Sequence, residues 1–381
     1  MSEPTKTAEK SGSKSARTHV VLQTAFLGDV LLGVPLYLRM REIWPDHKLV
    51  LICRKGLADF FLKTHLFDEV FEVTKNDARS YKHARLQLSA YDVDILFCPH
   101  ESLRSALFSQ SIKAQTKISF SKMWNRFFFT DRILKLQSWP DPLRQLSLIF
   151  PWDAELKKSC ERWTSQTAFY EKDANAKMSD IPSWASMDLK EKIQQDDFNF
   201  YQVTHRFKIQ IPKTKKWVLI FPGSVWATKM WTTEGFVKVG QKLAAMGWQV
   251  FVMGGPGEEA LCKEVASQIP DSLDLSGRTS IYESALLLTR ADLMIGNDSA
   301  STHLACLAGV PTVSIFGPTL LEFGFRPWSN QSFVVEKEGL LCRPCGPHGH
   351  QKCPLGTHEC MKNISTDSVL QVIRHITQVS F

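Results

Sequence analysis

Short apolar runs typical of buried strands alternate with helix-type segments along most of the chain. In the second half these runs cover 217–221, 249–253, 273–275, 293–295 and 312–316. The first half has the same pattern, with runs at 19–24, 48–53, 70–73 and 95–98. Alternation of this kind favours parallel sheets, because a helix between two parallel strands returns the chain to its starting edge. We therefore predict an α/β fold with two doubly wound, Rossmann-like domains.

The length of 381 residues exceeds what one hydrophobic core usually supports, so two domains are expected. We assign 1–17 to a disordered polar tail, 18–205 to a first domain and 206–364 to a second. A C-terminal helix within 365–381 could pack back on the first domain. The boundary between the domains precedes the polar segment IPKTKK, which leads into the strand-type run at 217–221.

The stretch 296–318, GNDSASTHLACLAGVPTVSIFGP, has the pattern of a strand–turn–helix–strand unit. The strand ends at Gly296-Asn297, Asp298 or Ser299 is expected to cap the next helix, and Gly309 ends it. In the same way, Thr232 or Thr233 is expected to cap a helix over 234–246. At the carboxyl edge of a parallel sheet, free backbone N–H groups can stabilise a diphosphate. A purely structural turn is the alternative.

Composition excludes some classes of protein and leaves others open. The net charge of +7 suits an anionic partner, but a modest Lys excess is also common in soluble proteins. No uninterrupted apolar run reaches the 18 residues that would predict a membrane span. The polar start of the chain lacks the apolar region of a secretory signal, so the cytoplasm is the expected location. The dinucleotide motif G-x-G-x-x-G is absent after the first strand, which disfavours a dehydrogenase.

Residues 118–150 break the alternating pattern because basic and aromatic side chains are interleaved there. Such a stretch could lie at a membrane interface or line a groove for an amphiphile. Our preferred interpretation is a helix whose aromatic side chains face the core.

Four motifs occur in the order and rough spacing of a known family. They are FLGDVLLGVPLYLRMREIWP near the start, FPGSVWATKMW, GNDSASTHLACLAGVPTVSIFGPT, and CRPCGPHGHQKCPLGTHECM near the end. On these motifs the chain resembles the ADP-heptose:lipopolysaccharide heptosyltransferases of glycosyltransferase family 9, most closely the heptosyltransferase II type. The resemblance covers about residues 18–380.

The resemblance implies a GT-B fold, in which an acceptor domain and a nucleotide-sugar domain face each other across a cleft. It also implies inverting transfer of heptose from ADP-heptose to the lipid A–core acceptor, with the second heptose as the expected product. The reaction would take place at the cytoplasmic face of the inner membrane, with peripheral membrane contact and no nucleic acid. No catalytic metal or other cofactor is implied.

The same resemblance assigns roles to individual residues. Asp29, in the G-D-V turn, would be the base that takes the proton of the acceptor hydroxyl. Arg54 and Lys55 would face phosphate or carboxylate groups of the acceptor. The residues implied on the donor side are Ser224, Thr228, Lys229, Glu258, Asp298, Ser299, Ala300 and His303. The family more often has Gly-Pro-Met where this chain has Ala300-Ser301-Thr302, which removes backbone freedom from the loop.

Most of these residues also have an ordinary structural interpretation. Asp29 could simply cap a helix, and a carboxylate there is a weaker base, although burial opposes that effect. Lys229, Arg54 and Lys55 could be solvated surface charges. His303 could be a structural helix residue, and Glu258 or Glu259 could be a first-turn acid favoured by the helix dipole.

The nine cysteines fall into two groups. Five are scattered among apolar neighbours and are expected to be buried free thiols. The other four, Cys342, Cys345, Cys353 and Cys360, follow the spacing C-x2-C-x7-C-x6-C. Thiolates in tight loops suit tetrahedral zinc, so a structural zinc ion is possible; a thiol-lined structural loop is the alternative we favour.

Three rival functions follow from the same residues. The first is a family relative that uses a different nucleotide sugar or acceptor. The second is a zinc-stabilised nucleic-acid-binding protein, which the scattered basic residues disfavour. The third is a nucleotide-binding regulator without catalysis, which the presence of Asp29 disfavours.

Overall fold

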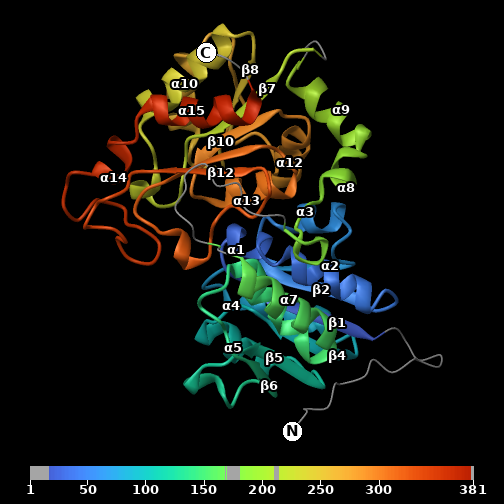
Figure 1. Cartoon of the computed structure of the whole chain (residues 1–381). Helices are drawn as coiled ribbons and strands as arrows, with labels where there is room; N and C mark the ends of the chain where they lie inside the picture. Colours follow the sequence, from blue (N-terminus) through green and yellow to red (C-terminus); the bar gives the residue numbers. More distant parts are fainter. Residues whose placement is uncertain (1–16, 168, 170–180, 210–213, 379–381) are drawn as a thin grey trace. The chain divides into compact units, whose positions relative to one another are not determined.

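Residues 17–167, 169, 181–209 and 214–378 are described by a computed structural model of the chain (Figure 1). They form two compact units, the first made mainly of residues up to 168 and the second of residues from 186 onward. The predicted tail at 1–17 lies outside the described residues except for Arg17.

The first unit is built on a six-stranded parallel sheet with the order β3-β2-β1-β4-β5-β6. Its strands are β1 (Thr18–Gln23), β2 (Lys48–Arg54), β3 (Glu69–Val73), β4 (Val93–Cys98), β5 (Thr116–Phe120) and β6 (Asp131–Ile133). Its helices are α1 (Leu27–Leu31), α2 (Val34–Ile43), α3 (Ala58–Lys63), α4 (Ala78–Leu88), α5 (Leu103–Gln110), α6 (Asp141–Leu146) and α7 (Ala154–Gln166). The order reverses between β1 and β4, which makes the carboxyl ends of these two strands the expected ligand site.

The second unit repeats this topology, with the sheet order β12-β11-β10-β7-β8-β9. Its strands are β7 (Trp217–Phe221), β8 (Gln249–Val252), β9 (Leu273–Asp274), β10 (Leu293–Asn297), β11 (Thr312–Phe316) and β12 (Ser332–Glu336). Its helices are α8 (Lys190–Gln194), α9 (Asp197–Arg206), α10 (Thr233–Ala245), α11 (Glu259–Ser267), α12 (Ile281–Thr289), α13 (Ala300–Leu307), α14 (Glu359–Lys362) and α15 (Thr366–Thr377). Here the order reverses between β7 and β10.

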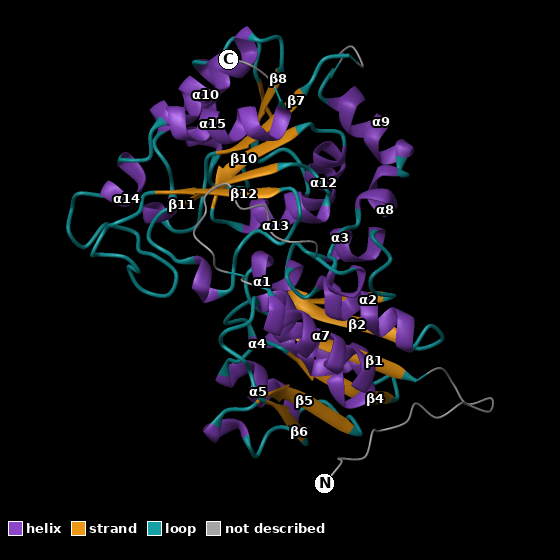
Figure 2. Ribbon diagram, viewed as in Figure 1, coloured by secondary structure: helices purple, strands orange, loops and turns teal. Residues whose placement is uncertain are grey.

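Helices cover both faces of the second sheet (Figure 2). Apolar side chains of α10, α11 and α15 share one core with alternate residues of the strands, such as Val218 and Ile220 of β7. Helices α12 and α13 lie on the other face. This arrangement explains why the central strands are apolar on both sides, as parallel strands must be when helices cover them.

The helices before β7 and the C-terminal helix both belong to the second unit. Helices α8 and α9, within the segment assigned to the first domain, belong to the second unit. Tyr282 of α12 donates a hydrogen bond to Asp196, which caps α9, at 2.8 Å. Helix α15 packs on α10, β11 and β12 of the second unit, and its apolar side chains join the core of that unit.

The basic and aromatic stretch at 118–150 is not the helix that we preferred. It contains the end of β5, a 3-10 turn at Met123–Asn125, the short strand β6 and helix α6. Phe129 and Trp139 are buried, whereas Met123 and Phe127 are strongly exposed. No helix among the described residues has the length and apolar character needed to cross a bilayer.

Candidate active site

A buried ion pair marks the carboxyl edge of the second sheet at its switch point. Lys229, in the turn after β7, places Nζ 2.6 Å from Oδ2 of Asp298, the residue that follows β10. Thr319 donates its hydroxyl to the same carboxylate oxygen at 2.6 Å. The side chains of Lys229 and Asp298 are only 13% and 6% exposed. The structure thus brings two predicted donor-side residues together with Thr319, which sequence reasoning missed.

Asp298 and Ser299 were the two residues expected to cap α13. Ser299 occupies the N-cap position of α13, and neither its hydroxyl nor the Asp298 carboxylate makes the capping hydrogen bond. The Ser299 hydroxyl is 2.7 Å from that of Ser301. The first N–H groups of α13, including that of Ala300, consequently have no side-chain cap, and such groups can stabilise an anion.

Asn297, the last residue of β10, holds the loop that follows β7. Its Nδ2 donates to the carbonyl of Pro222 at 2.8 Å, and its Oδ1 accepts from the N–H of Trp231 at 2.9 Å. The loop that carries Lys229 is therefore tied to the end of β10, directly before Asp298. Sequence reasoning missed this residue as well, although its position at the end of a buried strand was a usable signal.

His303 is buried one turn into α13, and its Nδ1 has no hydrogen-bond partner. Burial lowers the pKa of His303 to about 4, with Lys229 acting in the same direction and Asp298 against it. The imidazole is thus neutral near pH 7. The charges of both Asp298 and Lys229 contribute to the pKa of His303.

Glu258 and Glu259 have different surroundings at the start of α11. Glu258 accepts from the N–H of Gly255 at 2.8 Å, and its carboxyl group packs so closely on Gly223 that an added Cβ there would lie 2.2 Å from it. Burial raises its pKa. Glu259 accepts from the N–H of Gly257 at 2.7 Å, as a local first-turn acid does. Of the two, Glu258 therefore lies beside the loop after β7.

Ser224 and Thr228 belong to this same loop. The Ser224 hydroxyl is 3.4 Å from the N–H of Trp226, at the long limit of a hydrogen bond. Thr228 is buried, and its hydroxyl exchanges hydrogen bonds with the backbone of His350 at 2.7 and 2.9 Å. Thr228 therefore has a partner in the protein that its predicted role did not include.

In the first unit, Asp29 lies in α1, directly after β1 at the switch point. Burial raises the pKa of Asp29 to about 6, and the nearby charge of Asp141 adds to the rise. Backbone hydrogen bonds at Phe26 and Asp29, together with the charge of Lys135, act in the opposite direction but are smaller. Burial, one of the two effects weighed from the sequence, is the largest cause of the shift.

Several neighbours of Asp29 come from the stretch after β6. Gln145 donates to the Asp29 carbonyl at 2.8 Å and to the Asp141 carboxylate at 2.7 Å. Lys135 contacts Glu101 and lies 4.0 Å from Asp141. These residues are more than 70 positions from Asp29 in the sequence, so no local pattern could connect them to it.

Of the two predicted acceptor-side cations, only Arg54 is held in place. Its Nε donates to the Thr24 carbonyl at 2.8 Å, and its guanidinium lies 4.4 Å from the centre of the Phe26 ring. Lys55 is exposed. Arg54 is thus fixed beside the loop after β1.

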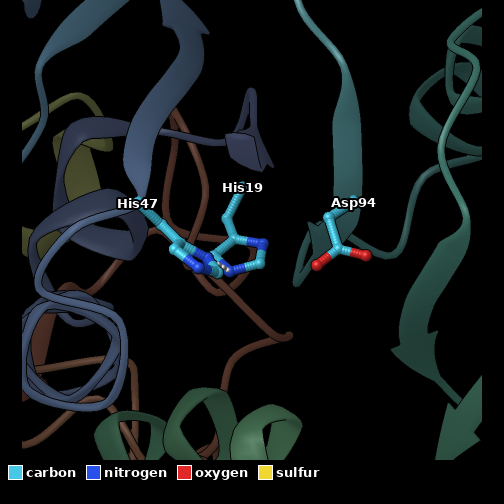
Figure 3. Close-up of side chains that lie close together, drawn as sticks. All are labelled: His19, His47 and Asp94. Atoms are coloured by element: carbon cyan, nitrogen blue, oxygen red, sulfur yellow. Dashed lines mark hydrogen bonds between the residues drawn. The ribbon is translucent and has the colours of Figure 1, made fainter. Parts of the chain in front are cut away.

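Among the described residues, one group of three possible metal ligands has its ligand atoms within 4.8 Å of one another: His19, His47 and Asp94 (Figure 3). His47 Nδ1 is 2.7 Å from His19 Nε2, and burial lowers the pKa of His19 to about 3. His19 and Asp94 are each the second residue of a strand, so the group lies at the amino edge of the sheet, opposite the edge that carries Asp29. We assign it no part in the site.

The model of the family described as "Glycosyltransferase family 9 (heptosyltransferase)" matches residues 81–357. The chain belongs to glycosyltransferase family 9. As a member of this family it shares 28% identity over 190 residues with lipooligosaccharide heptosyltransferase 2 of Campylobacter jejuni, covering 47% of this chain and 58% of that protein. Lipopolysaccharide heptosyltransferase 3 of Escherichia coli is 24% identical over 322 residues, covering 80% and 84%.

The fold of this family 9 member is similar to that of a solved relative. The structure of E. coli ADP-heptose LPS heptosyltransferase II matches with a TM-score of 0.72 and 16% identity, covering 95% of this chain and 98% of that one. The predicted GT-B fold class, with two parallel six-stranded sheets, is therefore confirmed. The matched sequence spans only 58% of the length of the Campylobacter relative.

Proposed function

We propose that the chain transfers heptose from ADP-heptose to the inner core of lipopolysaccharide with inversion at the anomeric carbon, and that it adds the second heptose. The observation that carries the proposal is the Lys229–Asp298–Thr319 arrangement beside the uncapped start of α13. It offers a cation and free N–H groups at one switch point, in a chain of the heptosyltransferase family. The nucleotide sugar and the acceptor are part of this proposal.

On the donor side, the leaving ADP carries growing negative charge as its bond to the sugar breaks. The Lys229 ammonium and the N–H groups at the start of α13 would meet that charge, and such preorganised donors are often the largest contribution to catalysis. Asp298 would hold the ammonium in place. His303 is neutral at working pH and would add no charge of its own.

On the acceptor side, Asp29 would act as general base. The acceptor hydroxyl attacks the anomeric carbon on the face opposite ADP, its proton passes to the Asp29 carboxylate, and the electrons of the breaking C–O bond go to the diphosphate. A base is most effective when its pKa lies near the working pH. The raised pKa of about 6 suits this role better than that of an exposed aspartate.

Peripheral contact with the inner membrane is part of the proposal. The segment 122–136 exposes Met123, Phe127 and Leu134 beside Lys122 and Arg126. Apolar side chains next to cations suit the boundary of an anionic bilayer, where the lipid A part of the acceptor is anchored. This supports action at the cytoplasmic face of that membrane.

The position of the heptose is tested by the choice of acceptor. Truncated inner-core acceptors that carry no, one or two heptoses are each incubated with ADP-heptose, and ADP release and product mass are measured. We expect turnover on the one-heptose acceptor at least tenfold faster than on the other two. Preference for another acceptor would overturn the assignment to the second heptose, and no turnover on any of them would overturn the transferase proposal.

A second experiment tests how the pKa of Asp29 is set. Asp141→Asn removes a negative charge that raises this pKa, so the pKa of Asp29 should fall. Because only the carboxylate form accepts a proton, the acid limb of kcat/KM should move to lower pH. Asp92→Asn, an exposed residue at the amino edge of the sheet, serves as the control. An unchanged acid limb in Asp141→Asn would contradict the account.

A further inference from the structure

The loop between β12 and α14, together with α14 itself, gathers four cysteines around one small cavity. Cys342, Cys345, Cys353 and Cys360 all line it, and it encloses about 20 Å³. That volume suits a single water molecule or ion. All nine cysteines are free thiols, and the five outside this loop are each buried. The loop is therefore the one place among the described residues where four thiols share a cavity.

Two tight turns present three of these sulfur atoms, and the fourth belongs to Cys360 of α14. In the first, Cys342-Arg-Pro-Cys345 is followed by Gly346 with a φ of 74°. In the second, Cys353 is followed three residues later by Gly356 with a φ of 72°. Only glycine adopts this left-handed conformation without strain.

The second turn places a hydrogen-bond donor beside one sulfur. The N–H of His358 lies 3.4 Å from Cys353 Sγ. A neutral thiol is a weak acceptor, whereas the thiolate is the form that binds metals. A backbone donor beside this sulfur therefore suits a metal-bound thiolate.

We propose that Cys342, Cys345, Cys353 and Cys360 bind one divalent metal ion, zinc in the first instance, in a tetrahedral thiolate site. Four soft sulfur ligands select zinc or iron over magnesium or calcium. In the structure these thiols do not form a group of three ligand atoms within 4.8 Å. Binding of the ion would therefore draw the two turns inward onto the cavity.

Hydrogen bonds also join this loop to the two segments of the donor site that carry Lys229 and Thr319. His350 and Thr228 are joined by backbone and hydroxyl hydrogen bonds of 2.7 to 3.0 Å, and His358 Nε2 donates to the Thr228 carbonyl at 2.8 Å. The N–H of Cys345 donates to the Pro318 carbonyl at 2.8 Å. Thr228 precedes Lys229 and Pro318 precedes Thr319, so the metal ion would fix the position of the residues around Asp298. This second part rests on the proposed function.

The metal site is tested on the full chain, purified under reducing conditions without chelator, by elemental mass spectrometry. We expect about one zinc per chain in the wild type and in Cys160→Ala, a cysteine outside the loop. Cys342→Ser and Cys353→Ser should each lose the ion; Cys342 is exposed, so its replacement should not disturb folding. Finding iron in the purified chain in place of zinc would also support a metal site at these four cysteines, because iron is the other ion that prefers sulfur ligands.

Two results would overturn the metal site. One is a wild-type chain that contains neither metal and, after addition of Co²⁺, lacks the visible absorption of tetrahedral cobalt thiolate. The other is a full complement of metal in both serine variants. These readouts need no sugar substrate, so they are independent of the proposed transferase activity.

The positioning role has its own readout, the dissociation constant of ADP. Cys342→Ser should weaken ADP binding about tenfold, because supporting residues around a site typically change affinity by that order. Refilling the wild type with zinc after chelation should restore binding, whereas refilling the variant should not. Unchanged ADP affinity in a variant that has lost its metal would contradict the positioning role.

Discussion

Replacing Asp29 with asparagine is expected to lower kcat/KM by about 10²–10⁴-fold while leaving ADP binding intact, because a positioned general base contributes roughly that factor. Asparagine keeps the size and polarity of the side chain but cannot accept the proton of the acceptor hydroxyl. The measurement is ADP release with the preferred acceptor, together with titration of ADP into the variant. Asp59→Asn, which also removes a first-turn acid from a helix of the same unit, is the matched control.

The pH profile separates a base from a residue that only shapes the fold. In the wild type, kcat/KM should decline as the pH falls through about 6, where Asp29 becomes protonated. In Asp29→Asn the remaining activity should lack this acid limb. Activity close to wild type, or an unchanged limb in the variant, would remove the base assignment.

Replacing Lys229 with methionine is expected to have the second-largest effect. Loss of one preorganised donor to developing negative charge typically lowers the rate by about 10²–10³-fold. The variant should also bind ADP more weakly, unlike Asp29→Asn. Lys238→Met, which breaks an exposed pair with Glu234, is the control and should leave both quantities unchanged.

Stability must be measured beside activity in this variant. Removing Lys229 leaves the Asp298 carboxylate buried without its cation, and breaking such a buried pair typically costs about 3 kcal/mol or more. Adding Asp298→Asn removes the unpaired charge, so the double variant should recover much of the melting temperature but not the activity. Recovery of both would show that Lys229 acts only through folding.

The sequence predicted those parts of the fold that depend on local patterns. Helix α10 is capped by the Thr232 hydroxyl, as expected from its position before an apolar periodic segment. The apolar runs at 217–221 and 312–316 are the strands β7 and β11 within the same bounds. In each case neighbouring residues carry enough information, because the element must bury an apolar face.

Features that depend on distant contacts could not be predicted in this way. Asp298 or Ser299 was expected to cap α13, but Lys229 and Thr319 bind the Asp298 carboxylate, and both are remote in the sequence. Likewise, β5 and β6 were missed within the aromatic stretch, because the pairing of β5 with β4 and of β6 with β5 outweighs its mixed composition. The pKa of Asp29 depends on Asp141, which the fold alone brings near it.

The central claim is that Asp29 receives the acceptor proton while the residues around Lys229 hold the departing ADP. The most direct measurement is a crystal structure of Asp29→Asn with ADP-heptose and its acceptor, in which slowed chemistry preserves both substrates. We expect the diphosphate to contact Lys229 and the start of α13, and residue 29 to lie within hydrogen-bonding distance, about 2.6–3.2 Å, of the attacking hydroxyl. A diphosphate bound elsewhere, or a hydroxyl beyond the reach of residue 29, would contradict the claim.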